Sequence, residues 1–324
     1  MLGRDIPKAG GTRMNDIPKM GPTEWALLLM LSVLWGGAFF FSKVALGELP
    51  PFTVVLARVS LAAMALFAFL LATGRVVPRS RAVWAAFFGM ALLNNIVPFG
   101  LIFLAQTAIP SGLASILNAT TPIFSILIAH RLTADEKMTR AKLTGVGLGL
   151  AGVAVLMGGN AFVSDAPPLW ALLACLGAAL SYGFTSVFGR RFRRMGVEPV
   201  VVAFGQLAAA TLLAIPVAAV VDAPWSLPAP GGATLAALAG LALLSTALAY
   251  VLFFRILAVG GATNSSLVTL LIPVSAILLG TLVLGERLTA NHFAGMALIA
   301  LGLLVIDGRM LRLVGSQPPA GGHA

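Results

Sequence analysis

The sequence predicts an all-α integral membrane protein in which ten transmembrane helices form two inverted five-helix repeats. Three observations lead to this fold class. The chain of 324 residues is 59% hydrophobic and only 10% charged, whereas soluble domains are about 25% charged. Its apolar residues fall into ten runs of about 20 residues, the length that crosses a bilayer as a helix. The second half of the chain also repeats markers of the first half at a nearly constant offset.

Each apolar run forms one predicted span. The runs occupy residues 25–46, 52–72, 82–106, 111–131, 141–159, 168–189, 200–221, 233–257, 262–284 and 291–308. Transmembrane strands are disfavoured because a strand needs only about ten residues and alternates apolar with polar side chains. The first run is too long for a cleaved signal peptide and ends in bulky residues and Lys43. We therefore expect it to remain in the protein.

The distribution of positive charge orients the predicted helices. With the N-terminus in the cytoplasm, 18 of the 21 lysines and arginines lie in cytoplasmic segments, and the outer loops hold only Arg287. Cytoplasmic loops of membrane proteins carry such an excess of positive charge. We therefore expect a multi-pass protein of the plasma or inner membrane with both termini in the cytoplasm. The net charge of +10 follows from this bias and does not indicate a nucleic-acid partner.

The duplication divides the chain into two halves. Pro122 and the segment 136–139 in the first half are matched by Pro273 and the segment 286–289 in the second, at offsets of 151 and 150 residues. Because each half holds five helices, an odd number, the second half enters the membrane from the opposite side. The predicted units are a cytoplasmic tail at 1–23, a first repeat at 24–160, a second repeat at 166–310 and a cytoplasmic tail at 311–324.

The repeated markers resemble those of the EamA family of the drug/metabolite transporter (DMT) superfamily. The resemblance covers about residues 25–308, with both copies in register. Its markers are Trp35-Gly36, Pro51 with Arg58, Pro122, Glu136 with Thr139, Ser245-Thr246-Ala247, Pro273 and Gly285 to Thr289. The first copy departs from the family pattern by reading Thr133-Ala134-Asp135-Glu136 where the family usually has Leu-Gly-Glu. The resemblance implies a transporter, with export more common than import.

Arg58 is the strongest single indication of a binding site. It lies about six residues inside the second predicted helix, or roughly 9 Å along its axis. An arginine at the centre of a membrane helix costs about 2.5–3.5 kcal/mol on insertion scales. Its guanidinium either faces a cavity and binds an anionic group such as a substrate carboxylate, or extends to the membrane surface or caps backbone carbonyls. The sequence leaves both readings open.

Other polar and aromatic residues fall where a central cavity is predicted. The fourth run carries polar positions at helical spacing, among them Ser115 and Asn118, and the matching face of the ninth run carries Thr269. Such polar residues either line a cavity or pack between helices. The aromatic candidates either contact a substrate or belong to the hydrophobic core. The candidate substrate-binding residues are Trp35, Phe39, Arg58, Asn94, Ser115, Asn118, Tyr182, Gln206, Tyr250 and Thr269.

The sequence favours a transporter that moves small metabolites, in particular amino acids or their derivatives, by alternating access at the repeat interface, with export as the direction. A lipid or lipid-phosphate translocase is the alternative. An integral-membrane enzyme is less favoured because the chain lacks His-Glu-x-x-His and Gly-x-Ser-x-Gly motifs. No Asp or Glu lies in the middle of a predicted span, which argues against proton-coupled exchange of bulky cations.

The sequence also sets expectations for cofactors and partners. Cys175 is the only cysteine, so there is no cysteine-based metal site. We expect no catalytic residue, no metal and no cofactor. The expected partners are a small-molecule substrate and membrane lipid, and the sequence is compatible with a homodimer.

Overall fold

The computed structural model describes residues 21–134, 138–158, 167–256 and 268–307, and within these ranges every regular element is helical. Most of the two predicted tails lies outside the described residues, as does Glu136 of the first repeat marker. Seven helical spans in the described ranges are long and apolar enough to cross a membrane, and shorter apolar helices follow near the C-terminal end. The chain is therefore an all-helical, multi-pass membrane protein.

The observed helices follow the predicted apolar runs. The uninterrupted helices are α1 (Pro22–Ala45), α2 (Pro51–Ala72), α7 (Arg140–Gly158), α10 (Pro199–Val221), α13 (Val268–Leu284) and α14 (Ala290–Asp307). Another span, Leu169–Arg194, consists of α8 (Leu169–Phe188) and the short α9 (Arg190–Arg194). Proline is the first residue of α1, α2 and α10, where its missing N–H breaks no helical hydrogen bond.

Three spans are interrupted, which the apolar runs did not predict. The run expected as one helix over 111–131 forms two helices, α5 (Ser111–Asn118) and α6 (Thr121–Leu132). The spans Arg81–Gln106 and Gly232–Ile256 each contain π-helical turns. The former comprises α3 (Arg81–Ala91), the π-helix η1 (Leu92–Ile96) and α4 (Val97–Gln106), and the latter begins with α11 (Gly232–Ala239) and the π-helix η3 (Gly240–Leu248). π-Helical turns are rare and occur frequently at functional sites.

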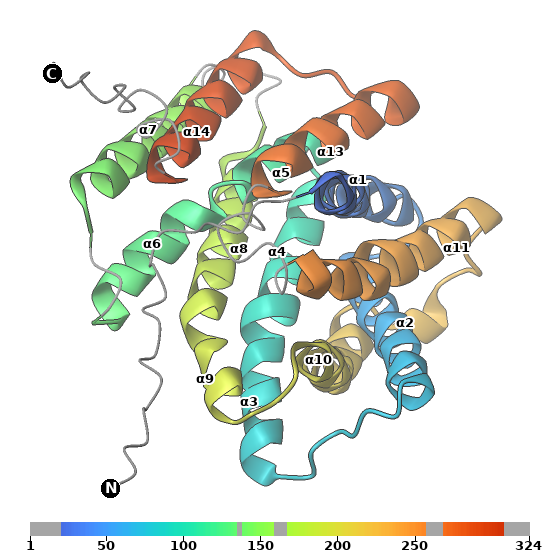
Figure 1. The fold of residues 1–324 in the computed structure, drawn as a ribbon. Helices are drawn as coiled ribbons and strands as arrows, with labels where there is room; N and C mark the ends of the chain where they lie inside the picture. The colour runs from blue at the N-terminus through green and yellow to red at the C-terminus, as the bar shows by residue number, and fades with distance from the viewer. Residues whose placement is uncertain (1–20, 135–137, 159–166, 257–267, 308–324) are drawn as a thin grey trace, which may run out of the picture.

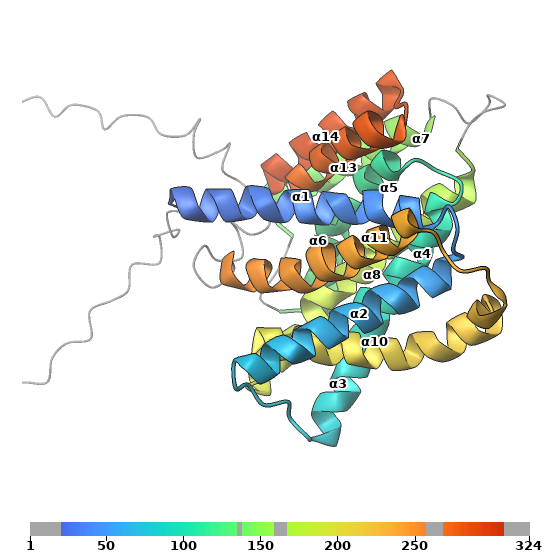
Figure 2. The same cartoon turned by 90° about the vertical axis from the view of Figure 1, so that its right-hand side faces the viewer.

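Helices from the two halves of the chain pack together throughout the molecule. Helix α1 packs against α13, and α8 packs against α4, α5 and α6. Helices α1, α2, α10 and α11 run roughly along one direction in Figure 2. Helices α7 and α14 lie side by side at one edge of the molecule (Figure 1). The interior between these groups is where the candidate site lies.

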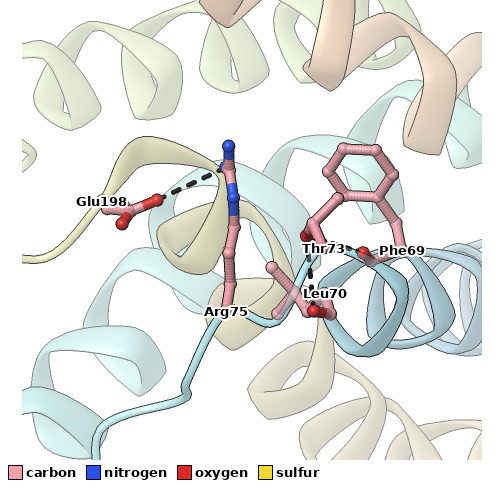
Figure 3. A network of polar contacts seen from close by, with 5 residues as sticks. All are labelled: Phe69, Leu70, Thr73, Arg75 and Glu198. Carbon is pink, nitrogen blue, oxygen red and sulfur yellow. Dashed lines mark hydrogen bonds and ion pairs between the residues drawn. The ribbon is translucent and has the colours of Figure 1, made fainter.

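Helices α2 and α10 lie side by side (Figure 2), and polar contacts join them at both ends. Asp222, which follows α10, accepts hydrogen bonds from the Thr53 N–H at 2.6 Å and the Thr53 hydroxyl at 3.0 Å, and so caps the start of α2. At the other end, Arg75 Nη1 lies 3.3 Å from Glu198 Oε2 (Figure 3). These two contacts fix an antiparallel pair. The ion pair is exposed and contributes at most about 1 kcal/mol.

Glycines allow close contact between α7 and α14. A Cβ added to Gly152 would lie 2.7 Å from the Gly295 carbonyl oxygen, and one added to Gly302 would lie 2.5 Å from the Gly145 carbonyl oxygen. Membrane helices associate largely through van der Waals packing, and small residues at the interface let their backbones approach. These glycines therefore serve the packing of α7 against α14.

Gly152→Ala is expected to destabilise the protein, because the new methyl group has no space against α14. Overpacking of this kind costs about 1–3 kcal/mol. Gly147 is the matched control, since it lies on the same helix and a Cβ there meets nothing within 4 Å. The measurement is the apparent melting temperature of each purified variant in detergent. Equal melting temperatures for Gly152→Ala and Gly147→Ala would contradict this account of the interface.

Candidate functional site

A cavity of about 1010 Å³ lies among helices of both halves of the chain. Its volume is at the upper end of the range of small-molecule sites, which is about 300–1,000 Å³. Nine of the ten predicted site residues line it. These are Trp35, Phe39, Arg58, Asn94, Asn118, Tyr182, Gln206, Tyr250 and Thr269.

Ser115 does not line the cavity. It is fully buried, and its hydroxyl donates a hydrogen bond of 2.6 Å to the Gly112 carbonyl one turn earlier in α5. The interruption after α5 separates the polar positions of the fourth run, so they do not form one continuous cavity wall. Ser125 in α6 does line the cavity.

Arg58 is buried among aromatic rings in the cavity wall. Its guanidinium carbon lies 3.7 Å from the centre of the Phe99 ring and 5.8 Å from that of Phe103. Arg58 Nε donates a hydrogen bond of 3.0 Å to the Thr246 hydroxyl oxygen. A desolvated cation–π contact stabilises a cation by about 2 kcal/mol or more, but it does not neutralise the charge.

The charge of Arg58 has no ionic partner in the part of the chain that the structure describes. The ion pair found there joins Arg75 to Glu198, and the structure gives the terminal guanidinium nitrogens of Arg58 no acceptor among these residues. A buried charge is normally paired or coordinated. The cavity therefore offers an anion two hydrogen-bond donors in the planar arrangement that binds a carboxylate.

Three side chains join two interrupted spans to α10 beside Arg58. Asn94 in η1 donates hydrogen bonds from Nδ2 to Gln206 Oε1 at 2.9 Å and to the Tyr250 hydroxyl at 3.0 Å. These contacts connect three separate helical spans inside the membrane region. Each hydrogen bond also satisfies polar groups that would be costly to bury without a partner. Asn94 and Gln206 therefore both line the cavity and bond between helices.

Aromatic rings form the apolar part of the wall. The Trp35 ring centre lies 5.3 Å from that of Phe253, and the rings of Tyr250 and Phe254 are stacked at 6.1 Å. Such rings supply a large, rigid apolar surface. An apolar or aromatic substrate body fits this wall.

Two polar atoms in the lining are buried without a hydrogen-bond partner among the described residues. They are Ser245 Oγ and Asn118 Oδ1. Leaving such a group unsatisfied costs about 1–3 kcal/mol. Ser245 is fully buried and precedes Thr246, which binds Arg58. Both atoms are therefore available to a bound molecule.

Among the described residues, the cavity is bordered by exposed residues at one end and by buried residues at the other. Exposed residues at the junction of α9 and α10, including Arg193 and Glu198, line its mouth. At the far end the Ser42 hydroxyl donates to Gln106 Oε1 at 2.6 Å, and Gln106 Nε2 donates to the Phe39 carbonyl at 2.9 Å. All three residues are buried. A bound molecule can reach Arg58 from the mouth while this network closes the opposite end.

Glu286 adds a second connection between the halves at the closed end. Its carboxylate accepts hydrogen bonds from the Ser111 N–H at 2.7 Å, the Ser111 hydroxyl at 2.9 Å and the Gly112 N–H at 3.1 Å. These N–H groups begin α5 and have no partner within that helix. The charged acceptor also lies at the positive end of the helix dipole. Glu286 therefore caps the start of α5.

Some site residues were not among those predicted from sequence. Phe99 and Phe103 contact Arg58. They are four residues apart and therefore lie on one helix face, a pattern that could have identified them as partners of Arg58. Thr246 and Ser245 appeared only as family markers. They lie in η3, where π-helical turns change the residue spacing, so ordinary helical periodicity does not place them.

No group of three His, Cys, Asp or Glu side chains that could hold a metal ion occurs among the residues with described positions. Away from the mouth, where Arg193 and Glu198 lie, the polar groups of the cavity are mainly the Arg58 guanidinium, amides and hydroxyls. Such groups bind and orient an anion rather than coordinate a metal.

The chain is similar to membrane transporters over most of its length. The model of the EamA-like transporter family matches it twice, at residues 23–158 and 169–307. The uncharacterized inner membrane transporter YedA of Escherichia coli strain K12 is 30% identical over 285 residues, or 86% of this chain and 89% of YedA. The uncharacterized transporter YoaV of Bacillus subtilis strain 168 is 28% identical over 287 residues, or 86% of this chain and 94% of YoaV.

One relative has a more specific name. A probable amino-acid metabolite efflux pump of Escherichia coli strain K12 is 26% identical over 294 residues, covering 88% of this chain and 95% of the pump. A crystal structure of another protein has a TM-score of 0.65 at 23% identity and covers 92% of this chain and 100% of that chain. This structural similarity shows that the two proteins share a fold.

Glu286→Gln is expected to lower the apparent melting temperature, because the amide keeps one acceptor but sets an NH₂ group against donor groups of α5. Loss of hydrogen bonds to a charged group costs about 1.5–3 kcal/mol. Glu198→Gln is the control, since its exposed ion pair contributes at most about 1 kcal/mol. If the two variants melt at the same temperature, Glu286 does not stabilise the closed end.

Proposed function

Because this chain belongs to the EamA-like transporter family, we propose that it moves a small metabolite across the membrane by alternating access to the cavity around Arg58. The chain is a transmembrane transporter. One observation carries the mechanism: a buried arginine without an ionic partner in the described residues faces a cavity that is open at one end and closed at the other.

The proposed architecture is ten crossings in two inverted repeats. The duplicated markers support it, and so do the helix contacts, which come in reciprocal sets. The contact of α1 with α13 has its counterpart in the contact of α8 with α5 and α6, and each half contributes one member to the pairs α2 with α10 and α7 with α14. The two family matches divide the chain in the same way. Repeats of this kind place the substrate site at their interface.

Reciprocal polar ties also support the repeat. Glu48 in the first half accepts a hydrogen bond of 2.6 Å from the Gly231 N–H in the second half. Glu198, 150 residues later, pairs with Arg75 of the first half. Each half thus extends a carboxylate to the other half from the segment just before its second helix.

The proposed orientation puts both termini and the cavity mouth on the cytoplasmic side. The mouth lies beside the arginine-rich α9, and positive residues concentrate in cytoplasmic segments. In this orientation the structure is the inward-facing state. The polar network at Ser42 and Gln106 and the Glu286 cap then close the outer side.

The proposed substrates are amino acids or their derivatives, and the proposed direction is export. The efflux pump named among the relatives supports both choices. The cavity supports the substrate class, since Arg58 provides donors for a carboxylate and the aromatic wall accommodates an apolar side chain. An inward-facing cavity also fits loading from the cytoplasm.

Arg58→Ala is expected to reduce transport by roughly 30-fold or more, since losing one member of a buried charge pair costs about 2–5 kcal/mol. The flux of Arg58→Lys is expected to lie between those of the unmodified protein and Arg58→Ala, because an ammonium keeps the charge but cannot form the planar two-point contact. Arg79→Ala, in an exposed loop, is the control. Flux would be measured in proteoliposomes, with size-exclusion profiles to show that each variant is folded. Unchanged flux in Arg58→Ala would remove Arg58 from the site.

The function itself is tested with the purified protein in liposomes loaded with labelled amino acids, with and without a pH gradient. We expect protein-dependent flux of at least one amino acid or derivative, insensitive to the gradient because the predicted spans carry no central carboxylate. Movement of an anionic lipid between leaflets without any amino-acid flux would contradict the proposal in favour of a lipid translocase.

A further inference from the structure

We propose that the cavity selects substrates that carry a carboxylate and an apolar body but no ammonium group, such as N-acylated or deaminated relatives of aromatic amino acids. This inference rests on the proposed transport function and specifies the charge of its substrate. It follows from the charges of the lining, from the state of its hydrogen-bond acceptors and from two unused polar atoms.

The lining is positive. Its cations among the described residues are Arg58 and Arg193, and the one carboxylate among them is Glu198. Glu198 is 61% exposed at the mouth and forms an ion pair with Arg75 (Figure 3). An ammonium group that reaches Arg58 therefore finds no unpaired carboxylate in the described wall. The attraction that zwitterion sites provide for the amine is missing at this position.

Backbone carbonyls are the usual alternative partners of an ammonium, and at two of the three interruptions such a carbonyl already accepts a hydrogen bond from a threonine hydroxyl. Interrupted helices in transporters expose carbonyl oxygens that bind cations. Here the Thr121 hydroxyl donates to the Asn118 carbonyl at 2.7 Å, at the break between α5 and α6. The Thr246 hydroxyl donates to the Leu241 carbonyl at 2.7 Å within η3. The carbonyls of Asn118 and Leu241 at these two interruptions therefore already have donors.

The aromatic wall does not reverse this preference. Ring faces attract cations, and Trp35 and Phe253 are available. In an α-amino acid, however, the ammonium is held next to the carboxylate and therefore close to Arg58. Repulsion between two full charges exceeds the attraction of a charge to a ring quadrupole at comparable distances. The rings are better matched to the apolar body of the substrate.

Two buried atoms match an N-acylated carboxylate. Ser245 Oγ has no partner in the described structure and is adjacent in the chain to the Thr246 that holds Arg58, so it can donate to a carboxylate. Asn118 Oδ1 is also without a partner and is an acceptor that an amide N–H can satisfy without bringing a charge. Together with Arg58 these atoms provide donors for the acid and an acceptor for an uncharged nitrogen.

The test compares ligands that share one phenylalkyl body and differ in charge: N-acetylphenylalanine, 3-phenylpropionate, phenylalanine and 2-phenylethylamine. Binding to the purified full-length protein would be measured by calorimetry. We expect the two anions to bind about tenfold or more tightly than phenylalanine, a difference readily resolved in Kd, and 2-phenylethylamine to bind most weakly. Phenylalanine or 2-phenylethylamine binding as tightly as the anions would overturn the inference.

The outcomes separate this inference from the proposed function. If the liposome assay shows flux of free amino acids and neither anion binds, the inference falls and the transport function stands. If no ligand binds and no amino acid is carried, both fall.

A charge introduced at Asn118 provides a second test that does not depend on Arg58 variants folding. Asn118→Asp sets a carboxylate in the wall, so we expect the preference for N-acetylphenylalanine over phenylalanine to shrink by about tenfold. Asn118→Leu has similar volume and removes the amide oxygen without adding a charge, so N-acetylphenylalanine is expected to bind more weakly while 3-phenylpropionate still binds more tightly than phenylalanine. An unaltered preference in Asn118→Asp would contradict the inference.

Discussion

The burial of one positive charge is the constraint on which the rest of this structure depends. Arg58 lies inside the second span against Phe99, and its Nε is held by Thr246 from the other half of the chain. Removing a guanidinium from water is expensive unless something replaces its hydration. Aromatic faces and one hydroxyl replace part of it, and the remaining donors face the cavity. The remaining donors of Arg58 can therefore bind an anion in the cavity.

The interrupted spans explain how the wall acquires its polar groups in an otherwise apolar chain. The π-helical turns η1 and η3 place Asn94, Ser245 and Thr246 in the lining, and the break after α5 does the same for Asn118. Irregular backbone within a membrane is tolerated where it borders a cavity or is buried in protein. The threonine hydroxyls at these points satisfy carbonyls that the irregular turns leave exposed.

Much of the fold was predictable because the bilayer imposes simple rules on composition and length. The apolar runs predicted where helices form, and Arg58, Tyr250 and Gln206 could be identified as cavity residues because polar groups in lipid face inward. The interruptions were not predictable, because apolar composition indicates which segments are buried in the membrane but does not indicate the pattern of backbone hydrogen bonds within them. Ser115 shows the consequence: regular helical spacing places it beside Asn118, but its hydroxyl is satisfied within α5 and it lies outside the lining.

The most direct test of the account is the accessibility of a cysteine introduced at Ser125, which lines the cavity, in a background where the buried Cys175 is replaced by serine. A membrane-impermeant maleimide would be applied to each face of the membrane in turn. The account predicts reaction from the cytoplasmic face alone in the resting protein, and reaction from the outer face as well when a transported substrate is present. Reaction confined to one face under both conditions would contradict alternating access.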